Sequence, residues 1–511
     1  MSINSDELNY LVYRYLQESG FTHSAFTFAY ESLVAKSSVA GKEIPPGALV
    51  SFIQKGLQYV EIEAHLSEDG ANVLNGQPLS LLNAHLCQSK AAKAGPVPRE
   101  SEEQRRAANG DDGTLSRDGG NCNGGQRCAT AKDGYRDGAK RMSKTAPEIP
   151  EHDVSVLRGH GSEVFICAWS PKANLLASGS GDSTARIWGV PPGASGVPAG
   201  DMASANPIEL RHVSSSAQTS KDVTTIDWSG DGTKLATGSY DGQARVWNTK
   251  GDLLATLTSH KGPIFSLKWN TAGDLLLSGS VDKTAIVWDA ATGVVKQQFA
   301  FHYAPTLDVD WRNRDTFATC STDKLIHVCK VGDATPVRTF KGHRDEVNAI
   351  KWDPTGTLLA SCSDDYTAKI WSLDSGHNSC AHDLCEHTKE IYTIRWSPTG
   401  PGTDNSGIPM LASASFDATV KLWDVEAGRC VHTLAEHSDP VYSVAWSPNG
   451  RFLASGSFDR CLHIWSVKDG TLVKSFRGGG GIFEVCWNAA GDKLAACFSD
   501  NTVVVLDYRT F

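Results

Sequence analysis

Short runs of alternating apolar and polar residues recur throughout the chain beyond residue 150. In residues 451–465, RFLASGSFDRCLHIW, an apolar run is followed by a Ser-Phe-Asp turn and by a second alternating run that ends in Trp. The turn Asp returns at intervals of 59, 41, 41, 42, 52, 42 and 41 residues. A period of about 40 to 45 residues with short strands is typical of a β-propeller blade. The eight copies, Asp182, Asp241, Asp282, Asp323, Asp365, Asp417, Asp459 and Asp500, therefore predict eight blades.

Each repeat has the same order of elements. A first strand ends in Trp and follows a His in seven of the repeats. A turn and a second strand come next, and a third strand ends six residues after the turn Asp. The first strands end at Trp169, Trp228, Trp269, Trp311, Trp352, Trp396, Trp446 and Trp487, and the third at Trp188, Trp247, Trp288, Trp371, Trp423 and Trp465. These two positions hold all 14 Trp of the chain. In the fourth and eighth repeats, Cys329 and Leu506 replace the third-strand Trp.

The recurring His, Ser, Asp and Trp raise the question of catalysis, because Ser, His and Asp form the hydrolase triad. An active site is needed once, whereas this set returns in most repeats. We therefore interpret it as a structural network, in which a buried His bridges the turn Asp and a Ser hydroxyl and the indole is the final donor. The residues assigned to it are His160, Asp182, Trp188, His343, Asp365, Trp371, His437, Asp459 and Trp465. No catalytic residue, metal ligand or cofactor is predicted, and the chain is not expected to be an enzyme.

The two ends of the repeat region complement each other. The eighth repeat stops after its third strand, at NTVVVLDYRTF, and residues 154–157, VSVL, alternate suitably to supply the missing fourth strand. Pairing of the two ends removes a sheet edge and closes the ring. The predicted propeller spans residues 154–511. Residues 189–220 and 400–409 are predicted to be insertions that form surface loops.

The N-terminal residues have the spacing of helices. In residues 5–19 the apolar side chains recur at every third or fourth position, and Gly20 follows where a helix can end. A second short helix is expected to begin near Thr22. Two helices this short cannot bury their apolar residues alone, so the sequence predicts that residues 1–36 pair with another copy; a helical hairpin docked on its own chain is the alternative. The pairing residues would be Leu8, Leu11, Val12, Tyr15, Leu16, Phe21 and Phe26.

Two further segments separate this module from the repeats. Residues 41–86 include a helical stripe at 44–66 and are predicted to be a helical region, either ordinary core or a docking site. Residues 88–150 are rich in charge and Gly and poor in large apolar residues, which predicts a flexible linker. Cys122 and Cys128, in CNGGQRC, do not have the spacing of a zinc pair.

Composition narrows the class of protein. A net charge of −10 gives no sign of sequence-specific DNA binding. No apolar run approaches the roughly 18 residues that cross a bilayer, and MSINSDELNY lacks the order of a secretory signal, so no membrane association is expected. The 13 Cys are an odd number and lie mostly inside the repeats, which favours a reducing intracellular compartment.

One candidate binding site emerges from positions that the repeat does not require. Four residues before the first-strand Trp, and just before the turn Asp, several repeats hold an aromatic residue. If both positions lie near the blade tops, these rings would surround the mouth of the propeller and bind an extended peptide. The alternative is that the rings only pack between blades. The candidates are Phe165, Tyr240, Phe265, Tyr392, Phe416, Tyr442, Phe458 and Phe483, of which Phe458 stands in the opening stretch.

Longer stretches of the chain resemble a known family. The segment LVYRYLQESGF resembles the LisH dimerisation motif, and LRGHGSEVFICAW and EVNAIKWDPTG resemble WD repeats. Together with QKGLQYVE, HKGPIF and GGIFEVCWNAAGDK, they make residues 1–85 and 154–511 similar to the transducin β-like, F-box-like/WD-repeat family of corepressor-associated adaptors. Residues 41–86 correspond to its F-box-like region, whereas the linker shows no resemblance.

The resemblance implies a function that the residues alone do not reveal. It implies a nuclear, non-enzymatic adaptor that binds nuclear receptor corepressors, a class I histone deacetylase, a G-protein pathway suppressor and histone tails. It also implies homo-oligomers through the LisH region and a link to ubiquitin and the proteasome in the exchange of corepressor for coactivator. A substrate receptor of a Skp/cullin-type ubiquitin ligase is the alternative.

Overall fold

The structure is a computed structural model of the 511-residue chain that describes residues 5–18, 49, 147–190, 206–212, 221–373, 380–404 and 409–510. The chain divides into two compact units, Met1–Lys140 and Arg141–Phe511, and each is described by itself. The predicted second helix with Phe21 and Phe26, most of the region 41–86 and nearly all of the linker with its two Cys lie outside the described residues, as do parts of both insertions. Their limits stay predictions.

The first unit contains the predicted N-terminal helix. Helix α1 (Ser5–Glu18) has the expected start and ends one residue earlier than expected. Tyr10 and Leu11 are buried, whereas Leu8 and Tyr15 are 45% and 38% exposed. Residues seven apart lie on one face of an α-helix, so Leu8 and Tyr15 form an exposed apolar stripe. Within the described residues, no helix is long and apolar enough to span a membrane.

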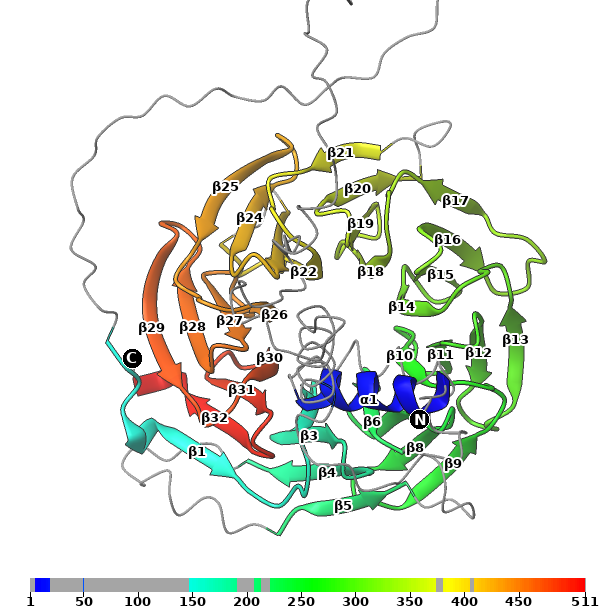
Figure 1. The fold of residues 1–511 in the computed structure, drawn as a ribbon, viewed down its shortest axis with the longest axis horizontal. Helices are drawn as coiled ribbons and strands as arrows, with labels where there is room; N and C mark the ends of the chain where they lie inside the picture. The colour runs from blue at the N-terminus through cyan, green and yellow to red at the C-terminus, as the bar shows by residue number, and fades with distance from the viewer. Residues whose placement is uncertain are drawn as a thin grey trace, which may run out of the picture. The chain divides into compact units, whose positions relative to one another are not determined.

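The second unit is a ring of eight four-stranded antiparallel sheets, which confirms the predicted eight-bladed propeller. Figure 1 shows the sheets arranged around a central axis, with the first strand of each blade innermost and the fourth outermost. Second strands such as β11 (Leu275–Ser280) are buried along their whole length, because neighbouring blades cover both faces. Fourth strands such as β25 (Arg429–Leu434) alternate exposed and buried residues, because one of their faces meets solvent.

The first four blades follow one another along the chain. Blade 1 comprises β2 (Val164–Trp169), β3 (Leu175–Ser180), β4 (Thr184–Gly189) and β5 (Ile208–Arg211). Blade 2 comprises β6 (Val223–Trp228), β7 (Lys234–Ser239), β8 (Ala244–Asn248) and β9 (Leu253–Leu257). Blade 3 comprises β10 (Ile264–Trp269), β11, β12 (Ala285–Asp289) and β13 (Val295–Phe299). Blade 4 comprises β14 (Thr306–Trp311), β15 (Thr316–Ser321), β16 (Leu325–Lys330) and β17 (Arg338–Lys341).

The remaining four blades complete the ring. Blade 5 comprises β18 (Val347–Trp352), β19 (Leu358–Ser363), β20 (Ala368–Ser372) and β21 (Cys380–Leu384). Blade 6 comprises β22 (Ile391–Trp396), β23 (Met410–Ser415), β24 (Val420–Asp424) and β25. Blade 7 comprises β26 (Val441–Trp446), β27 (Phe452–Ser457), β28 (Cys461–Ser466) and β29 (Thr471–Arg477). Blade 8 comprises β30 (Ile482–Trp487), β31 (Lys493–Phe498), β32 (Val503–Asp507) and β1 (Val154–Leu157). Short 3-10 turns, Glu151–Asp153 and Tyr508–Thr510, flank the last blade's outer strands.

The ring closes as the sequence predicted. Strand β1 pairs antiparallel with β32, with Val154 opposite Leu506 and Leu157 opposite Val503. The chain just before β1 also contacts the preceding blade, because the Ile149 N–H donates a 2.9 Å hydrogen bond to the Ser475 carbonyl of β29. Ile149 is buried in the apolar core that blades 7 and 8 share. The segment before β1 therefore contacts blades 7 and 8, and β1 then completes blade 8.

Candidate partner-binding face of the propeller

The turn Asp of blade 1 sits at the end of a directed chain of hydrogen bonds. The Trp188 indole N–H donates to Ser178 Oγ at 2.8 Å, and His160 places Nε2 2.7 Å from that hydroxyl. His160 Nδ1 lies 3.0 Å from Asp182 Oδ2. Because the Ser oxygen receives the indole proton, its own proton points to Nε2, which leaves Nδ1–H to donate to the carboxylate.

The carboxylate also orders the turn itself. Asp182 accepts a 2.8 Å hydrogen bond from the Gly161 N–H and a 2.6 Å one from the Thr184 hydroxyl. Burial alone would raise the pKa of the Asp182 carboxyl, but the bonds from His160 and Thr184 hold that pKa well below its usual value. The polar side-chain groups of His160, Ser178, Asp182 and Trp188 are thus hydrogen-bonded to one another or to the turn. The set stabilises the turn, and its Ser hydroxyl is not a free nucleophile.

Four other blades repeat this geometry closely. The His-to-Asp distance is 2.8 Å or 2.9 Å and the His-to-Ser distance 2.7 Å or 2.8 Å, with the indole 2.8 Å from the same Ser. The sets are His260, Ser278, Asp282 and Trp288; His343, Ser361, Asp365 and Trp371; His387, Ser413, Asp417 and Trp423; and His437, Ser455, Asp459 and Trp465.

Blade 2 departs from the pattern in a way that the sequence did not predict. Arg245 donates a 2.8 Å hydrogen bond to His212 Nδ1 and a 3.3 Å one to Asp241 Oδ2, so it stands between the two. His212 must then donate through Nε2 to Thr237 Oγ1 at 2.8 Å, the opposite tautomer to blade 1. Burial, and then the Arg245 charge, lower the pKa of His212 well below its usual value. An Arg four residues after the turn Asp does not predict this change by itself, because Arg186 holds the same position in blade 1, where His160 contacts Asp182 directly.

Blades 4 and 8 depart further. In blade 4, His302 bridges Asp323 and Thr319 at 2.8 Å and 2.9 Å, while Cys329 replaces the indole, as the sequence indicated. In blade 8, a run of four Gly, residues 478–481, stands where the other repeats have His. A Cβ on Gly481 would lie 2.5 Å from the ring of Phe458 on blade 7, so Gly is needed there for that ring to pack.

A second His sits beside the network in blade 7. The ligating atoms of His437, Asp459 and His463 lie within 4.8 Å of one another, the one such group of three among the described residues. The His437 and His463 rings are 4.3 Å apart and tilted by 30°, close to stacked. Ring nitrogens bind metals through lone pairs in the ring plane, and those of stacked rings do not converge on one point. His437 and Asp459 therefore belong to the turn network, whereas His463 packs on the His437 ring with its buried Nδ1 outside that network.

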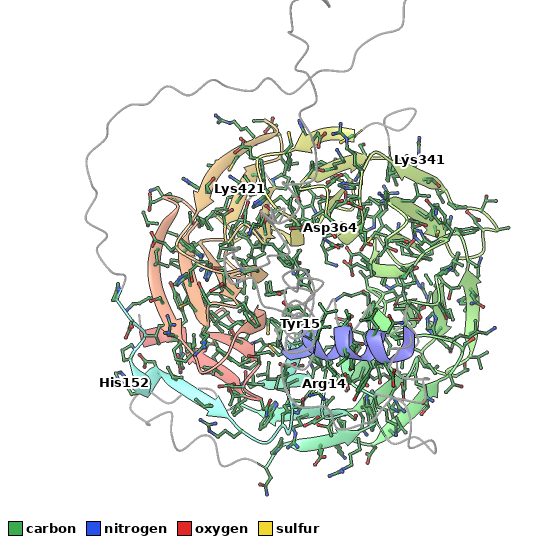
Figure 2. All side chains as sticks on the ribbon, viewed as in Figure 1. Arg14, Tyr15, His152, Lys341, Asp364 and Lys421 are labelled. Carbon is green, nitrogen blue, oxygen red and sulfur yellow. The ribbon has the colours of Figure 1, made fainter. Side chains whose placement is uncertain are left out.

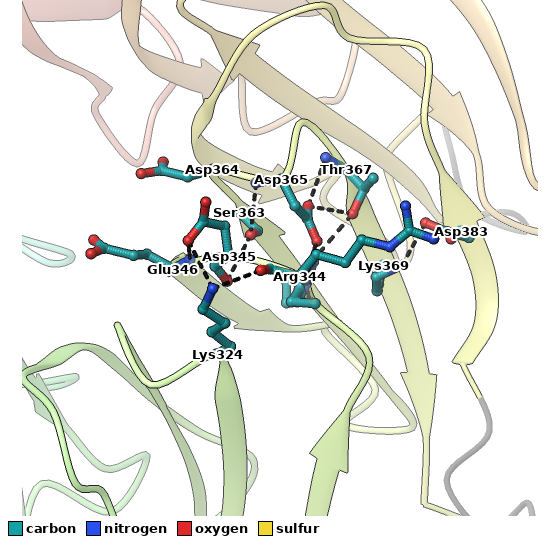
Figure 3. A network of polar contacts seen from close by, with 12 residues as sticks. Lys324, Arg344, Asp345, Glu346, Ser363, Asp364, Asp365, Thr367, Lys369 and Asp383 are labelled. Carbon is teal, nitrogen blue, oxygen red and sulfur yellow. Dashed lines mark hydrogen bonds and ion pairs between the residues drawn. The ribbon is translucent and has the colours of Figure 1, made fainter.

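The turns also connect neighbouring blades (Figure 3). In blade 5, Asp365 accepts a 2.8 Å hydrogen bond from the Arg344 N–H, while the Ser363 hydroxyl donates to the Asp345 carbonyl at 3.1 Å. Lys324, from the turn of blade 4, lies 3.2 Å from the Asp345 carboxylate and donates to the Arg344 carbonyl at 2.8 Å. The turn of blade 4 thus contacts the loop of the following blade through Lys324.

Six of the eight predicted aromatic residues lie together in one cluster. Tyr442 is at its centre, with ring centroids 5.1 Å from Tyr392, 5.4 Å from Phe416, 6.2 Å from Phe458 and 6.1 Å from Phe483. Phe483 lies 5.6 Å from Phe165, which extends the cluster from blade 6 to blade 1. We call these six residues the aromatic cluster.

The sequence left two interpretations of these rings, packing between blades and binding of a peptide, and the geometry of the aromatic cluster bears on both. They pack against one another between blades at distances typical of edge-to-face pairs. All six are half-buried rather than fully buried, so each keeps part of its surface open. Tyr240 and Phe265 hold the corresponding positions in blades 2 and 3 and are half-buried as well.

Carboxylates border the aromatic cluster at both of its ends. Asp364 of blade 5 holds the position that Phe416 and Phe458 hold in the next two blades, and Figure 2 shows it toward the centre of the ring, whereas Lys341 lies at the periphery. The Phe416 N–H donates to the Glu390 carbonyl at 2.9 Å. Glu163 and Asp222 occupy in blades 1 and 2 the position that Glu390 has in blade 6. We call Glu163, Asp222, Asp345, Asp364 and Glu390 the acidic rim.

The charges of the acidic rim repel one another. Burial, and then the neighbouring Asp222, raise the pKa of Glu163. Burial also raises the pKa of Asp364, against a hydrogen bond from Asn348, and Glu390 and Asp345 raise it further. Like charges held this close stabilise a cation placed between them. The sequence analysis missed the rim, although the recurring acid ahead of the first strand was visible there.

Another feature absent from the sequence analysis is a belt of charges on the inner strands. Lys351 Nζ lies 2.5 Å from Asp308 Oδ2 on the preceding blade, and Ile350 N–H donates to the same oxygen at 3.1 Å. Burial would raise the pKa of Asp308, but the Lys351 charge lowers it below its usual value. Further pairs join Asp227 to Lys268 at 3.8 Å and Arg395 to Glu484 at 3.5 Å. The alternating signs at Asp227, Lys268, Asp310 and Lys351, one per repeat, were a usable signal.

Comparison with known proteins places these features in a family. The family model "WD domain, G-beta repeat" matches residues 152–189, 210–248, 251–289, 334–372, 378–424, 428–466 and 470–507, and the model "LisH" matches residues 6–32. Residues 290–333, between two matched ranges, hold β14, β15 and β16 of blade 4. The structure therefore supplies the blade that the family model leaves out and the sequence period predicts.

Relatives extend the similarity over the whole chain. The mouse protein "F-box-like/WD repeat-containing protein TBL1X" is 53% identical over 547 aligned residues, which cover 100% of both chains. The Arabidopsis thaliana "WD40 repeat-containing protein HOS15" is 46% identical over 99% of this chain and 100% of its own. Among solved structures, the C-terminal WD40 domain of Sif2 matches 71% of this chain and 99% of that domain, with a TM-score of 0.61 and 26% identity.

Proposed function

Because this chain belongs to the transducin β-like family of F-box-like/WD repeat-containing proteins, we propose that it is a non-enzymatic adaptor of nuclear corepressor–histone deacetylase complexes. The observation that supports a binding role most directly is the aromatic cluster, half-buried on one arc of the propeller and bordered by the acidic rim. In the described residues, the His, Ser and Asp sets are used within the turns, so the proposal includes no chemical step.

The chemistry of this face favours an extended basic peptide. Partly open aromatic rings give apolar anchors for a side chain, and carboxylates on both sides favour Lys or Arg at its flanks. Histone tails have this composition, and a corepressor segment with an apolar anchor between basic residues has it as well. Nuclear receptor corepressors, a class I histone deacetylase and histone tails are therefore the proposed partners, and the nucleus the proposed location.

The N-terminal unit supplies the second half of the proposal. The exposed stripe of Leu8 and Tyr15 on α1 lies within the segment that matches the LisH model. Burial of such a stripe against a second copy would stabilise a homo-oligomer, to which a G-protein pathway suppressor and a corepressor segment would bind. Several propellers would then act on one chromatin template, with a gain in avidity from each additional copy.

A second candidate function has one specific observation in its favour. The mouse relative is named F-box-like, and residues 41–86 are the region that we predict to correspond to this part of the name. A substrate receptor of a Skp/cullin-type ubiquitin ligase would use that region for the ligase and the propeller for the substrate. A stable assembly with Skp and cullin subunits that lacks deacetylase, purified from nuclear extract, would favour it over the adaptor, which is expected to link to ubiquitin and the proteasome only in corepressor exchange.

The adaptor proposal is tested by the binding of basic peptides to the full-length protein. The Tyr442→Ala and Phe458→Ala variants are expected to weaken binding of histone-tail and corepressor peptides by about tenfold each, as for interface anchors. Tyr303→Ala is the matched control, since Tyr303 is a 67% exposed aromatic residue of blade 4 outside the cluster. Asp364→Asn should weaken binding less and reduce its salt dependence. Unchanged affinity in both cluster variants, with wild-type melting curves, would exclude this face as the binding site.

A further inference from the structure

Three cysteines lie together where the last blade meets the first. Cys167 on β2 and Cys486 on β30 place their Sγ atoms 3.4 Å apart, although 319 residues separate them along the chain. Cys497, on β31 of blade 8, is buried in the same apolar cluster as Cys167. All three are free thiols. Figure 1 shows that these blades, the first and the last of the ring, lie side by side.

The positions of Cys167 and Cys486 both hold Cys only at the interface between blades 8 and 1. The residue two before the first-strand Trp is Cys167 in blade 1 and a branched aliphatic residue in the others: Ile226, Leu267, Val309, Ile350, Ile394, Val444 and Val485. The residue one before that Trp is Cys486 in blade 8 and most often charged elsewhere, as in Asp227, Lys268, Asp310, Lys351 and Arg395. The interface that closes the ring therefore lacks the ion pairs of blades 2 to 5 and holds two sulfur atoms in contact.

The backbone fixes these two sulfur atoms relative to each other. The Trp169 indole N–H donates a 3.0 Å hydrogen bond to the carbonyl oxygen of Cys486 itself. The bond holds β2 alongside β30 at the height of the two thiols. An approach of about 1.4 Å from the 3.4 Å contact would reach the length of a disulfide bond, which is within the range of side-chain rotation.

We propose that Cys167 and Cys486 form a reversible disulfide that covalently joins the first and last blades when the protein meets the two-electron oxidant hydrogen peroxide. Cys486 reacts first, because it is half-buried whereas Cys167 is only 3% exposed. Its sulfur attacks the peroxide oxygen, the O–O bond breaks, and sulfenic acid and water form. The Cys167 sulfur then attacks the Cys486 sulfur, the S–O bond breaks, and hydroxide takes the Cys167 proton and leaves as a second water.

The surroundings set the rate of this reaction. The contact with Cys167, and then burial, raise the pKa of the Cys486 thiol well above its usual value. Burial raises the pKa of Cys167 in the same direction. The thiolate is the reactive form, so oxidation is slow at neutral pH and accelerates as the pH rises. The pair therefore responds to sustained oxidation, and a strong reductant reverses it.

The test uses the full-length protein and hydrogen peroxide at pH 7 and pH 8.5. After oxidation, remaining thiols are alkylated under denaturing conditions, and the protein is digested without reduction for mass spectrometry. The expected result is a linked peptide that contains Cys167 and Cys486, formed faster at pH 8.5 and absent after dithiothreitol. The oxidised protein should also melt about 5 °C or more above the reduced protein, because the bond closes a very long loop.

Matched variants separate this bond from other oxidation. Cys430→Ser removes a half-buried thiol of blade 6 and should leave the link and the rise in melting temperature unchanged. Cys486→Ala should abolish both; if it fails to fold, the peptide map of the wild-type protein decides alone. Full oxidation of the exposed Cys385 while Cys167 and Cys486 remain alkylated would overturn the inference. A link from Cys167 to Cys497 in place of Cys486 would overturn it too.

Discussion

The indole nitrogen of Trp228 donates a 3.0 Å hydrogen bond to the carbonyl oxygen of Ala168, on the inner strand of the preceding blade. Six other first-strand Trp residues make the same bond to the preceding blade: Trp169, Trp269, Trp311, Trp396, Trp446 and Trp487. The donor and acceptor are one repeat apart in sequence, except that Trp169 and its acceptor Cys486 come from the first and last blades. Because apolar packing between blades is non-directional, this bond, together with the ion pairs between inner strands, fixes how far one inner strand slides along the next.

Trp228→Phe should therefore destabilise the propeller by about 1 to 3 kcal/mol, because it leaves the carbonyl of the half-buried Ala168 without its donor. Trp352→Phe is the matched control, since Trp352 Nε1 is buried with no hydrogen-bond partner, and its ring lies 5.4 Å from the Arg312 guanidinium. A Phe ring keeps that cation contact. Thermal melts of both variants measure the difference in stability loss. Equal losses would show that the cost comes from the smaller ring alone and that the indole hydrogen bond contributes no stability.

Much of the fold was readable from the sequence because each blade repeats one local rule. The 41- and 42-residue intervals, the turn Asp and the closing strand at residues 154–157 each depend on residues within one repeat or on pairing at the chain ends. The inter-blade bonds depend on side chains one period apart, as in Trp269 and Asp227, and the sequence analysis compared positions only within a repeat. Arg245 shows the remaining limit: no pattern said that it would enter between His212 and Asp241.

The candidate site was predictable to a similar extent. The positions of the aromatic residues followed from the repeat, but the sequence could not show that six of them contact one another while each stays half-buried. That outcome depends on how ring size and blade tilt combine at the mouth of the propeller. The acidic rim was missed because its members look like ordinary surface carboxylates in the sequence, which shows neither the burial nor the neighbouring carboxylates that together raise the pKa values of Glu163 and Asp364.

A backbone strain recurs after every turn Asp. The following residue has a positive φ between 64° and 77° in all eight repeats: Ser183, Gly242, Lys283, Lys324, Tyr366, Ala418, Arg460 and Asn501. A residue with a Cβ pays about 1 to 2 kcal/mol for this conformation. Ala418→Gly should therefore raise stability by about 0.5 to 1 kcal/mol after the entropy cost of Gly. The measurement is the shift in the thermal midpoint.

The opposite substitution provides the control for this strain. A Cβ on Gly242 would lie 2.9 Å from the Gly262 carbonyl oxygen, in addition to the strain of the positive φ. Gly242→Ala should destabilise by about 2 kcal/mol or more. If Ala418→Gly lowers the midpoint, the turn must tolerate side chains without strain, and the argument from φ is wrong.

The charge belt predicts a non-additive pair of substitutions. Lys351→Met removes the partner of the Asp308 carboxylate, whose side chain is only 13% exposed, and should cost about 3 kcal/mol, because an unpaired charge remains with little access to water. Removal of both charges in Lys351→Met with Asp308→Leu should recover most of that loss, as apolar groups of similar size replace the pair. Denaturant unfolding of the two single variants and the double variant gives the coupling energy. Additive losses would show that the two residues do not interact.

The turn network predicts how stability depends on acid. Burial raises the pKa of Asp282, but the hydrogen bonds from His260 and Thr284 lower it to about 2. A carboxyl whose folded pKa is depressed stabilises the fold above its unfolded pKa of about 4, and that contribution is lost as the pH falls toward 2. The melting temperature should therefore fall steeply between pH 4 and pH 2. Asp282→Asn should melt lower than wild type at pH 7 and show a smaller fall on acidification; parallel curves would contradict this account.

The exposed stripe of α1 predicts the oligomeric state. Leu8 and Tyr15 are large apolar residues that lie 45% and 38% exposed on one helix face. If this face joins copies of the chain, Leu8→Glu with Tyr15→Glu should place charges in the interface and lower the mass in solution to that of the 54.8 kDa monomer. Light scattering after size exclusion measures the mass. Glu7→Gln, a substitution beside the stripe, should keep the wild-type mass, and the melting of the propeller should be unchanged in both variants because the stripe belongs to the other unit. If the mass of the double variant equals that of the wild type, this helix face does not join copies of the chain.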